Sequence, residues 1–331
     1  MGSANKPRAG SLAFKPRKRS RDFTPRISTW RSTDKVQLLG YPVYKVGMRQ
    51  AGMVDDSQSA TKGMELTVSV TILEAPKISV FAARLYRKTL TGRKCIGDAM
   101  SVSPKTASIL GMKKEKKEGE KKETKDIKWL EEKISSFKDD VKPDLYLSVL
   151  AHTNAVEAGL PKKTADIVEI GIGGEEIGKQ LEYVKTILGK EVTPKDIFEE
   201  GEYVDAIAVT RGHGWQGAVR RHGIHKQRPK ATGRVRHVGT LGPWTPHYVM
   251  YTTPQAGQHG FHRRTQYNNR ILIIGEDPKK ANVPGGYPHY GDVKTSFLCV
   301  RGSVPGTQKR FVFLRKALRN ASAQKPQVLW F

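Results

Sequence analysis

The feature that most restricts how this chain can fold is a long stretch, residues 211–264, that contains no Asp or Glu. It holds ten Arg or Lys residues and seven of the nine histidines of the chain. Its apolar residues follow no sustained period, and its Gly and Pro residues are incompatible with a long helix. A compact domain rarely tolerates such a loop unless the loop is functional or disordered. We expect this loop to pack against an external polyanion, because phosphate supplies the missing counter-charge.

The charge of the whole chain supports the same conclusion. Its 331 residues include 58 Lys or Arg and 32 Asp or Glu, which gives a formal charge of +26. A charge of this size calls for a polyanionic partner, for which nucleic acid is the commonest candidate and an anionic membrane surface the main alternative. The membrane alternative is weak, since the sequence has no run of about 18 apolar residues and its basic stretches are broken by Gly and Pro.

The amino-terminal part, residues 1–34, is predicted to be a basic extension without a core of its own. Residues 1–31 carry nine basic residues and a single acid, but they lack the apolar segment of a secretory signal. The two cysteines, Cys95 and Cys299, lie far apart and show no CxxC spacing, so neither a disulfide framework nor a zinc knuckle is indicated. These features together predict a cytoplasmic location.

Short apolar or alternating runs, separated by Gly and Pro, predict a mainly β protein. The predicted strands are residues 43–48, 65–73, 78–85, 204–210, 270–275, 295–300 and 310–314. Because a long middle section splits these strands, an antiparallel β-barrel with an insertion is favoured over a regular βαβ alternation. The barrel body is assigned to residues 35–86 and 203–331.

The middle section, residues 87–202, is predicted to be an inserted α/β subdomain. Apolar residues at helical spacing predict helices over 126–137 and 178–189, and apolar runs predict strands over 144–151 and 167–172. Residues 157–205 have a net charge of −6, which favours a face turned toward solvent. The mixed-sign run 113–125 is expected to be a solvated loop or frayed helix, and no function is assigned to it.

Basic, histidine and aromatic side chains of the loop and of the amino-terminal arm are the candidate RNA contacts. Arginines form forked hydrogen bonds to phosphate or stack on bases, lysines act as point charges, and aromatic rings stack on bases. Most of these contacts should position RNA rather than read its sequence. The candidates are Arg17, Lys18, Arg19, Arg211, His213, Trp215, Arg220, Arg221, His222, His225, Lys226, Arg228, Lys230, Arg234, Arg236, His237, His259, His262, Arg263 and Arg264.

Trp244 lies in a rigid turn within this loop. The two flanking prolines and the preceding glycine predict the tip of a hairpin-like finger. The alternative is a Trp that folds back to seal the core, as its large apolar area favours in other settings. The predicted tip consists of Gly242, Pro243, Trp244, Thr245, Pro246 and His247.

Residues 212–217, GHGWQG, match the GxGxxG pattern of dinucleotide-binding proteins and follow a predicted strand. That fingerprint requires a packed helix after the glycines and an acid about 20 residues further on. The residues that follow show no helical pattern, and the next acid is Glu276. No cofactor is therefore expected.

The clustered histidines raise the alternative of a metal site. No Cys, Asp or Glu lies within residues 211–264 to complete or orient a typical ligand set, so no metal is expected. A GxSxG motif or a compact acid cluster near the histidines is also missing from the sequence. Asp55 and Asp56 are adjacent, which suits a turn better than a catalytic pair. We expect no catalytic residue and no small-molecule substrate.

Several motifs together resemble one known family. They are GSLAFKPRKR at residues 10–19, GYPVYKVGMRQAGM at 40–53, RGHGWQGAVRRHGI at 211–224, GPWTP at 242–246, AGQHGFHRRTQYNNRI at 256–271 and RGSVPGTQKR at 301–310. Taken in order over nearly the whole chain, they resemble ribosomal protein L three of the large subunit, in its archaeal and eukaryotic form.

The resemblance implies a six-stranded translation-factor-like barrel with an inserted α/β domain, an amino-terminal extension and a long central loop, all packed into large-subunit rRNA. It implies that the loop around residues 220–236 and the Trp244 finger reach toward the peptidyl transferase centre on the A-site side. It also implies a role in early assembly, contacts with neighbouring ribosomal proteins, and a position near bound elongation factors. Catalysis would belong to RNA, so the protein would not be an enzyme.

Two other classes stay open at this point. A different architectural or assembly protein for nucleic acid would bind generic duplexes as tightly as ribosomal RNA. An RNA-modifying enzyme would need a small-molecule cofactor site and would turn over substrate.

Overall fold

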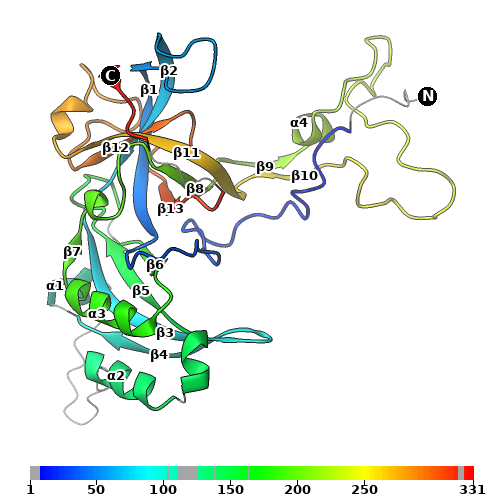
Figure 1. The fold of residues 1–331 in the computed structure, drawn as a ribbon. Coiled ribbons are helices and arrows are strands. Elements are labelled where there is room, and N and C mark those ends of the chain that lie inside the picture. The colour runs from blue at the N-terminus through cyan, green and yellow to red at the C-terminus, as the bar shows by residue number, and fades with distance from the viewer. Residues whose placement is uncertain (1–7, 103, 110–125, 138, 163, 320–323) are drawn as a thin grey trace. The chain divides into compact units, whose positions relative to one another are not determined.

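The computed structural model describes residues 8–102, 104–109, 126–137, 139–162, 164–319 and 324–331. In this part of the chain strands outnumber helices, and the helices are short, so the prediction of a mainly β protein is confirmed (Figure 1). Two compact units can be distinguished. The arm–loop unit comprises Met1–Asp22 and Val209–Arg264, and the body comprises Phe23–Ala208 and Thr265–Phe331. Within the described ranges no helix has the length and apolar character needed to cross a membrane.

The first sheet of the body closes on itself. Its strands are β1 (Gly40–Val54), β2 (Glu65–Glu74), β12 (Phe297–Arg301), β11 (Arg263–Gly275), β8 (Tyr203–Val209) and β13 (Phe311–Lys316), in that order around the sheet, and β13 pairs again with β1. The short strand β14 (Val328–Trp330) extends the sheet beside β1. Closure removes the exposed edges that an open sheet would present.

Close contacts between strands explain residue choice at the start of β1. A Cβ atom on Gly40 would lie 2.4 Å from the Phe313 ring and 2.6 Å from the carbonyl oxygen of Leu314. Since β13 pairs there with β1, with Gly40 opposite Arg315, only glycine allows the two backbones to approach.

The second sheet of the body follows the order β4-β3-β5-β6, with β7 also paired to β3. Its strands are β3 (Ile78–Thr89), β4 (Gly92–Met100), β5 (Leu145–Thr153), β6 (Ile167–Gly171) and β7 (Glu191–Val192). The helices of the body are α1 (Pro104–Ile109), α2 (Ile127–Ser135) and α3 (Ile177–Ile187), and the 3-10 turns are η1 (Asp139–Asp144), η2 (Pro194–Asp196) and η3 (Pro278–Lys280). Leu130 of α2 and Val184 of α3 belong to a core that also includes Leu147 and Phe313, so one hydrophobic core spans both sheets.

The structure corrects the placement of one predicted strand. Residues 78–85 form a strand as expected, but β3 lies in the second sheet and not among the strands of the closed sheet. The reason is local: β3 is joined to β4 by the two-residue turn at Leu90 and Thr91, and the hairpin pairs Thr89 with Gly92. A near neighbour in sequence is the easier pairing partner, and β4 was not predicted.

The other predicted strands and both predicted helices of the middle section are confirmed, although β1 and β11 are much longer than predicted. The domain boundaries at residues 34, 86 and 202 stay predictions. The mixed-sign run 113–125 lies outside the described residues.

A buried ion pair ties the strands β8 and β13 together. Asp205, with none of its surface exposed, accepts a hydrogen bond from Arg315 Nη2 at 2.7 Å. The same carboxylate accepts bonds from the backbone N–H groups of Asn268 at 3.1 Å and Leu318 at 3.2 Å. Arg315 also donates from Nη1 to the carbonyl of Thr29 at 2.7 Å. This network connects four separate segments of the body.

Candidate nucleic-acid interface

The arm–loop unit is built on a small scaffold. Strands β9 (Gly212–Gln216) and β10 (Gly257–Gly260) pair antiparallel, and the short helix α4 (Ala218–His222) follows β9 (Figure 1). Gly223 ends α4 in the left-handed conformation, with φ 68°, which glycine adopts without strain. Residues 224–256, between α4 and β10, form turns and bends without a strand or helix.

The amino-terminal arm is held on this scaffold by hydrogen bonds to the backbone. Arg17 Nη1 donates to the carbonyl of Arg221 at 2.7 Å, and Ser20 N–H donates to the carbonyl of Phe261 at 2.7 Å. His262 Nδ1 lies 2.8 Å from the carbonyl oxygen of Lys18. The described part of the arm and the base of the loop therefore form one folded unit, although they are about 200 positions apart in sequence.

Some predicted phosphate contacts have a structural role within the unit. Arg221 donates from Nε to the carbonyl of Gln258 at 2.9 Å and from Nη1 to the carbonyl of Gln255 at 3.1 Å. Burial and the nearby Arg17 lower the pKa of Arg221. Backbone carbonyls, and not carboxylates, thus stabilise these guanidinium groups, so the unit gains structure without losing positive charge.

Two of the candidate histidines, His222 and His262, are buried. A Cβ atom on Gly10 would lie 2.6 Å from His222 Nδ1, which shows how closely the arm covers this ring. Burial lowers the pKa of His222 to about 4, and the positive charges of Arg17, Arg221 and Lys15 add to the effect. Sequence composition did not distinguish these two core histidines from the exposed ones.

The lowered pKa of His222 predicts an acid-sensitive arm–loop unit. Between pH 6.5 and about 4 the unfolded histidine binds a proton that the folded one does not, so stability falls as the pH drops through this window. Hydrogen exchange of backbone amides in the arm and in α4 should accelerate over this range. His222→Gln should flatten this pH dependence, whereas His225→Gln, at an exposed position of the same loop, should leave it unchanged. A His222 ring that titrates at an ordinary pKa in NMR would contradict the prediction.

Most of the remaining candidates lie on the surface of the unit. Arg17, His213, Arg221, His259 and Arg264 are partly buried. The exposed candidates are Lys18, Arg19, Arg211, Trp215, Arg220, His225, Lys226, Arg228, Lys230, Arg234, Arg236, His237 and Arg263. Over its whole sequence the arm–loop unit has seventeen Arg or Lys residues and one acid, Asp22. Its surface charge therefore has almost no counter-charge of its own.

Aromatic rings are exposed among these cations. Trp244 is 85% exposed, and its ring meets that of His247 edge to face with centroids 5.6 Å apart. Trp215, Tyr248 and Tyr251 are exposed as well. The alternative in which Trp244 seals the core is wrong in this structure. The loop around it has bends and no strands, and the predicted finger stays a prediction.

Two histidine rings, one on β9 and one next to it on β10, stack on each other. His213 and His259 stack with centroids 5.4 Å apart, and Arg220 Nη2 donates to His213 Nδ1 at 3.3 Å. A polar stack of this kind presents flat faces and donors that suit nucleotides.

The GxGxxG residues form strand β9 and not a phosphate-binding turn. One expectation needs correction, because the five-residue helix α4 does follow directly after Gly217. The left-handed Gly223 stops it after little more than one turn, which explains why no helical period was visible. The acid-free sequence 211–264 supplies no carboxylate at the spacing that the fingerprint requires for the ribose.

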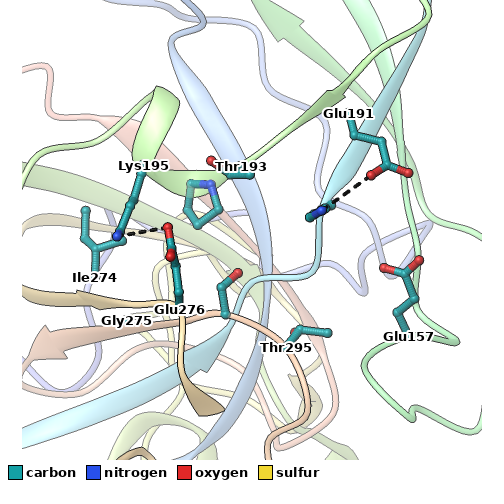
Figure 2. A pocket seen from close by; sticks show the side chains of 11 residues that line it. Glu157, Glu191, Thr193, Lys195, Ile274, Gly275, Glu276 and Thr295 are labelled. Carbon is teal, nitrogen blue, oxygen red and sulfur yellow. Dashed lines mark ion pairs between the residues drawn. The ribbon is translucent and has the colours of Figure 1, made fainter.

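Metal-ligand clusters and cavities are the other places in the described residues where a small ligand could bind. No group of three or more His, Cys, Asp or Glu is close enough to hold a metal ion in the described ranges. A cavity of about 610 Å³ in the body is lined by three glutamates, among other residues. Figure 2 shows its two ion pairs, Lys77 with Glu191 and Lys195 with Glu276. The two lysines of the lining are paired with two of its three glutamates, and no Ser or Cys with an adjacent His lines the cavity.

The fold and this surface define a class: strongly basic, mainly β proteins with a cationic unit built from an arm and a long loop. Comparison with known proteins gives the family. The family model described as ribosomal protein L3 matches residues 1–328, and the chain belongs to this family. The resemblance found in the sequence motifs is thereby confirmed.

Relatives match over almost their whole length. The large ribosomal subunit protein uL3 of Methanosphaera stadtmanae is 43% identical over 329 residues, covering 98% of this chain and 95% of the relative. That of Methanothermobacter thermautotrophicus is 43% identical, covering 99% and 97%. That of Methanocaldococcus jannaschii is 42% identical, covering 95% and 92%. Each comes from an organism of the archaeal lineage to which the motifs pointed.

Proposed function

We propose that this chain is a structural constituent of the large ribosomal subunit that binds large-subunit rRNA through its arm–loop unit. The observation that carries the proposal is the composition of the arm–loop unit, which has seventeen basic residues and one acid over its whole sequence and exposed aromatic rings in its described part. The names of the relatives support it, because each is a large ribosomal subunit protein. The site of action is then the ribosome, in the cytoplasm.

The proposed mechanism is charge neutralisation and positioning, not catalysis by the protein. Exposed arginines such as Arg228 and Arg234 form paired hydrogen bonds to phosphate oxygens, and Trp215 stacks on an unpaired base. Arg17, Arg221 and His262 hold the backbone that carries these groups, so less ordering is required when RNA binds. Release of counterions from RNA favours the complex.

The resemblance to the family adds finer proposals. The closed six-stranded sheet of the body corresponds to a translation-factor-like barrel. The tip, residues 242–247, reaches toward the peptidyl transferase centre on the A-site side. The protein takes part in early subunit assembly, contacts neighbouring ribosomal proteins and lies near bound elongation factors.

Sedimentation tests the proposed function directly. The native protein should migrate with the large subunit through a moderate-salt wash, because many phosphate contacts must be broken to release it. Purified protein should also bind large-subunit rRNA more tightly than generic duplex DNA or RNA. Equal affinity for generic duplexes would favour an architectural protein of another particle, and release with the free protein fraction would contradict the proposal.

Trp244→Ala tests the tip. Because Trp244 is 85% exposed, its removal should change the free energy of unfolding by less than about 0.5 kcal/mol. Subunits that carry the variant should assemble but bind A-site tRNA or an elongation factor less tightly. Trp30→Ala is the matched control, since Trp30 packs edge to face on Phe313 at 5.8 Å and should cost about 3 kcal/mol of stability. Equal destabilisation by both substitutions would show that Trp244 has a core role.

A further inference from the structure

The body has a pocket of its own that combines aromatic rings with cations, here called the Phe23 pocket. It encloses about 330 Å³, and its lining includes Phe23, Tyr44, Lys162, Lys309, Arg310 and Phe311. This volume is at the lower end of the range of small-ligand sites, about 300 to 1,000 Å³. A single nucleotide or a similar small group fits such a space, whereas a nucleic-acid duplex does not.

One wall of the Phe23 pocket offers a ring for stacking. Phe23 is 58% exposed, which is unusual for so apolar a side chain. The Arg310 guanidinium carbon lies 5.3 Å from the centroid of the Phe23 ring. Deeper in the pocket, Tyr44 and Phe311 meet edge to face with centroids 6.2 Å apart. An exposed ring next to a guanidinium is the combination that single-stranded nucleic-acid sites use.

Positive charge exceeds negative charge in the lining. Lys162, Lys309 and Arg310 face a single carboxylate, that of Asp166. Asp166 is buried, accepts hydrogen bonds from Tyr44 Oη at 2.8 Å and from Thr24 Oγ1 at 3.2 Å, and pairs with Lys162. Its lone pairs are therefore occupied inside the body. The pocket keeps a surplus of positive charge that suits an anion.

The loop that supplies Lys309 and Arg310 is held in place by hydrogen bonds to Lys45 of β1. Lys45 Nζ donates to the carbonyls of Val304 at 2.5 Å and Gly306 at 3.4 Å. Lys309 N–H donates to the carbonyl of Lys45 at 2.8 Å, and Lys309 adopts a left-handed backbone with φ 63°. The half-buried ammonium of Lys45 thus fixes the loop before any ligand arrives, which is the arrangement expected of a preformed site.

A sequence signal supports the same region. Residues 293–331 contain eight Lys or Arg residues and no Asp or Glu, as in the central loop but on a shorter scale. Arg315 and Lys316 are paired with acids from β8 and its preceding turn, Asp205 and Glu202. Lys309 and Arg310, two of the three cations of the Phe23 pocket, come from the loop just before β13. Neither belongs to the candidate set identified from the sequence.

We propose that the Phe23 pocket binds one unstacked nucleotide of single-stranded RNA. The base stacks on Phe23, and its phosphate lies against Lys309 and Arg310. The inference rests on the proposed binding of rRNA and adds a contact made by the body, separate from the arm–loop unit.

Photo-crosslinking with the full chain tests where the nucleotide lies. Phe23→p-benzoylphenylalanine should crosslink to large-subunit rRNA at a single-stranded nucleotide. The control is Leu90→p-benzoylphenylalanine, in the fully exposed β3–β4 turn, which should give at most trace product. Equal crosslinking from both positions would overturn the proposal, because any exposed residue would then reach RNA.

Affinity measurements test the chemistry of the contact. A fluorescent adenosine hexamer should bind Phe23→Ala about tenfold more weakly than the unmodified chain, the usual effect of losing one stacked base. Lys309→Ala should lower the affinity for the hexamer several-fold. Lys128→Ala, at an exposed position on α2, should leave that affinity unchanged. The affinity for a hexamer with the same backbone but without bases should not change with Phe23→Ala and should fall with Lys309→Ala.

The outcomes separate this inference from the proposed function. If the unmodified chain binds rRNA while Phe23→Ala and Lys309→Ala behave like Lys128→Ala, the pocket does not bind RNA although the proposed function stands. If inorganic phosphate or polyglutamate competes as well as the hexamer does, the site is a general anion site and the nucleotide assignment is wrong. If the unmodified chain does not bind rRNA, both proposals fail.

Discussion

Replacing Arg228, Arg234 and Arg236 together by alanine is expected to weaken binding to large-subunit rRNA by roughly 10- to 100-fold at moderate salt. All three side chains are exposed on the central loop. Each lost phosphate contact should lower the slope of log affinity against log salt by about 0.7 to 0.9, so three contacts lower it by about 2 to 3. Filter binding at salt concentrations from about 50 mM to about 200 mM measures both quantities.

A charge-matched variant makes this result specific. Lys62, Lys88 and Lys128 are exposed residues of the body, and their replacement by alanine removes the same net charge. If the arginines contact phosphate directly, only the first variant should reduce the salt slope by this amount. Equal slopes for the two triple variants would mean that overall charge and not the arm–loop unit determines binding.

Asp205→Ala is expected to destabilise the body by about 3 to 5 kcal/mol. The substitution leaves the Arg315 guanidinium, which is 5% exposed, without its buried carboxylate. It also removes the acceptor for the backbone N–H groups of Asn268 and Leu318. An uncompensated buried charge and two orphaned donors are among the costliest changes in a folded protein. Urea unfolding followed by tryptophan fluorescence measures the loss.

The exposed pair of Lys77 and Glu191 provides the control for Asp205→Ala. Both side chains are more than half exposed and lie 3.8 Å apart. Glu191→Ala should therefore change the free energy of unfolding by less than about 1 kcal/mol. A cost for Asp205→Ala as small as that for Glu191→Ala would show that the Asp205 network does not stabilise the body.

Strands with a strong apolar pattern could be predicted, and strands defined by their partners could not. Residues 206–209 and 311–314 are continuously apolar, and they lie in β8 and β13. In contrast, β4 has the sequence GRKCIGDAM and β9 has GHGWQ, which contain too few apolar residues to show a period of two. These segments become strands because β3 and β10 supply hydrogen-bonding partners, and a partner strand leaves no signal in the segment's own sequence.

In the candidate interface, too, the sequence predicted the properties of a segment but not the contacts between segments. Composition alone identified the loop as cationic, because lack of acids is a property of the segment and needs no coordinates. It could not show that His222 packs beneath Gly10, or that Arg221 binds the carbonyls of Gln255 and Gln258. Those roles depend on the arm meeting the loop. The sequence-based prediction also left out Lys309 and Arg310 of the proposed Phe23 pocket, although residues 293–331 contain no Asp or Glu.

The strands that flank the long loop, β8 and β11, are neighbours in the closed sheet. The loop therefore starts and finishes at adjacent strands. The sheet already holds the two ends of the loop close together, since paired strands lie about 5 Å apart. Each doubling of loop length then adds only about 0.6 kcal/mol of closure entropy. The length of this loop can therefore change at little cost to the free energy of folding of the closed sheet.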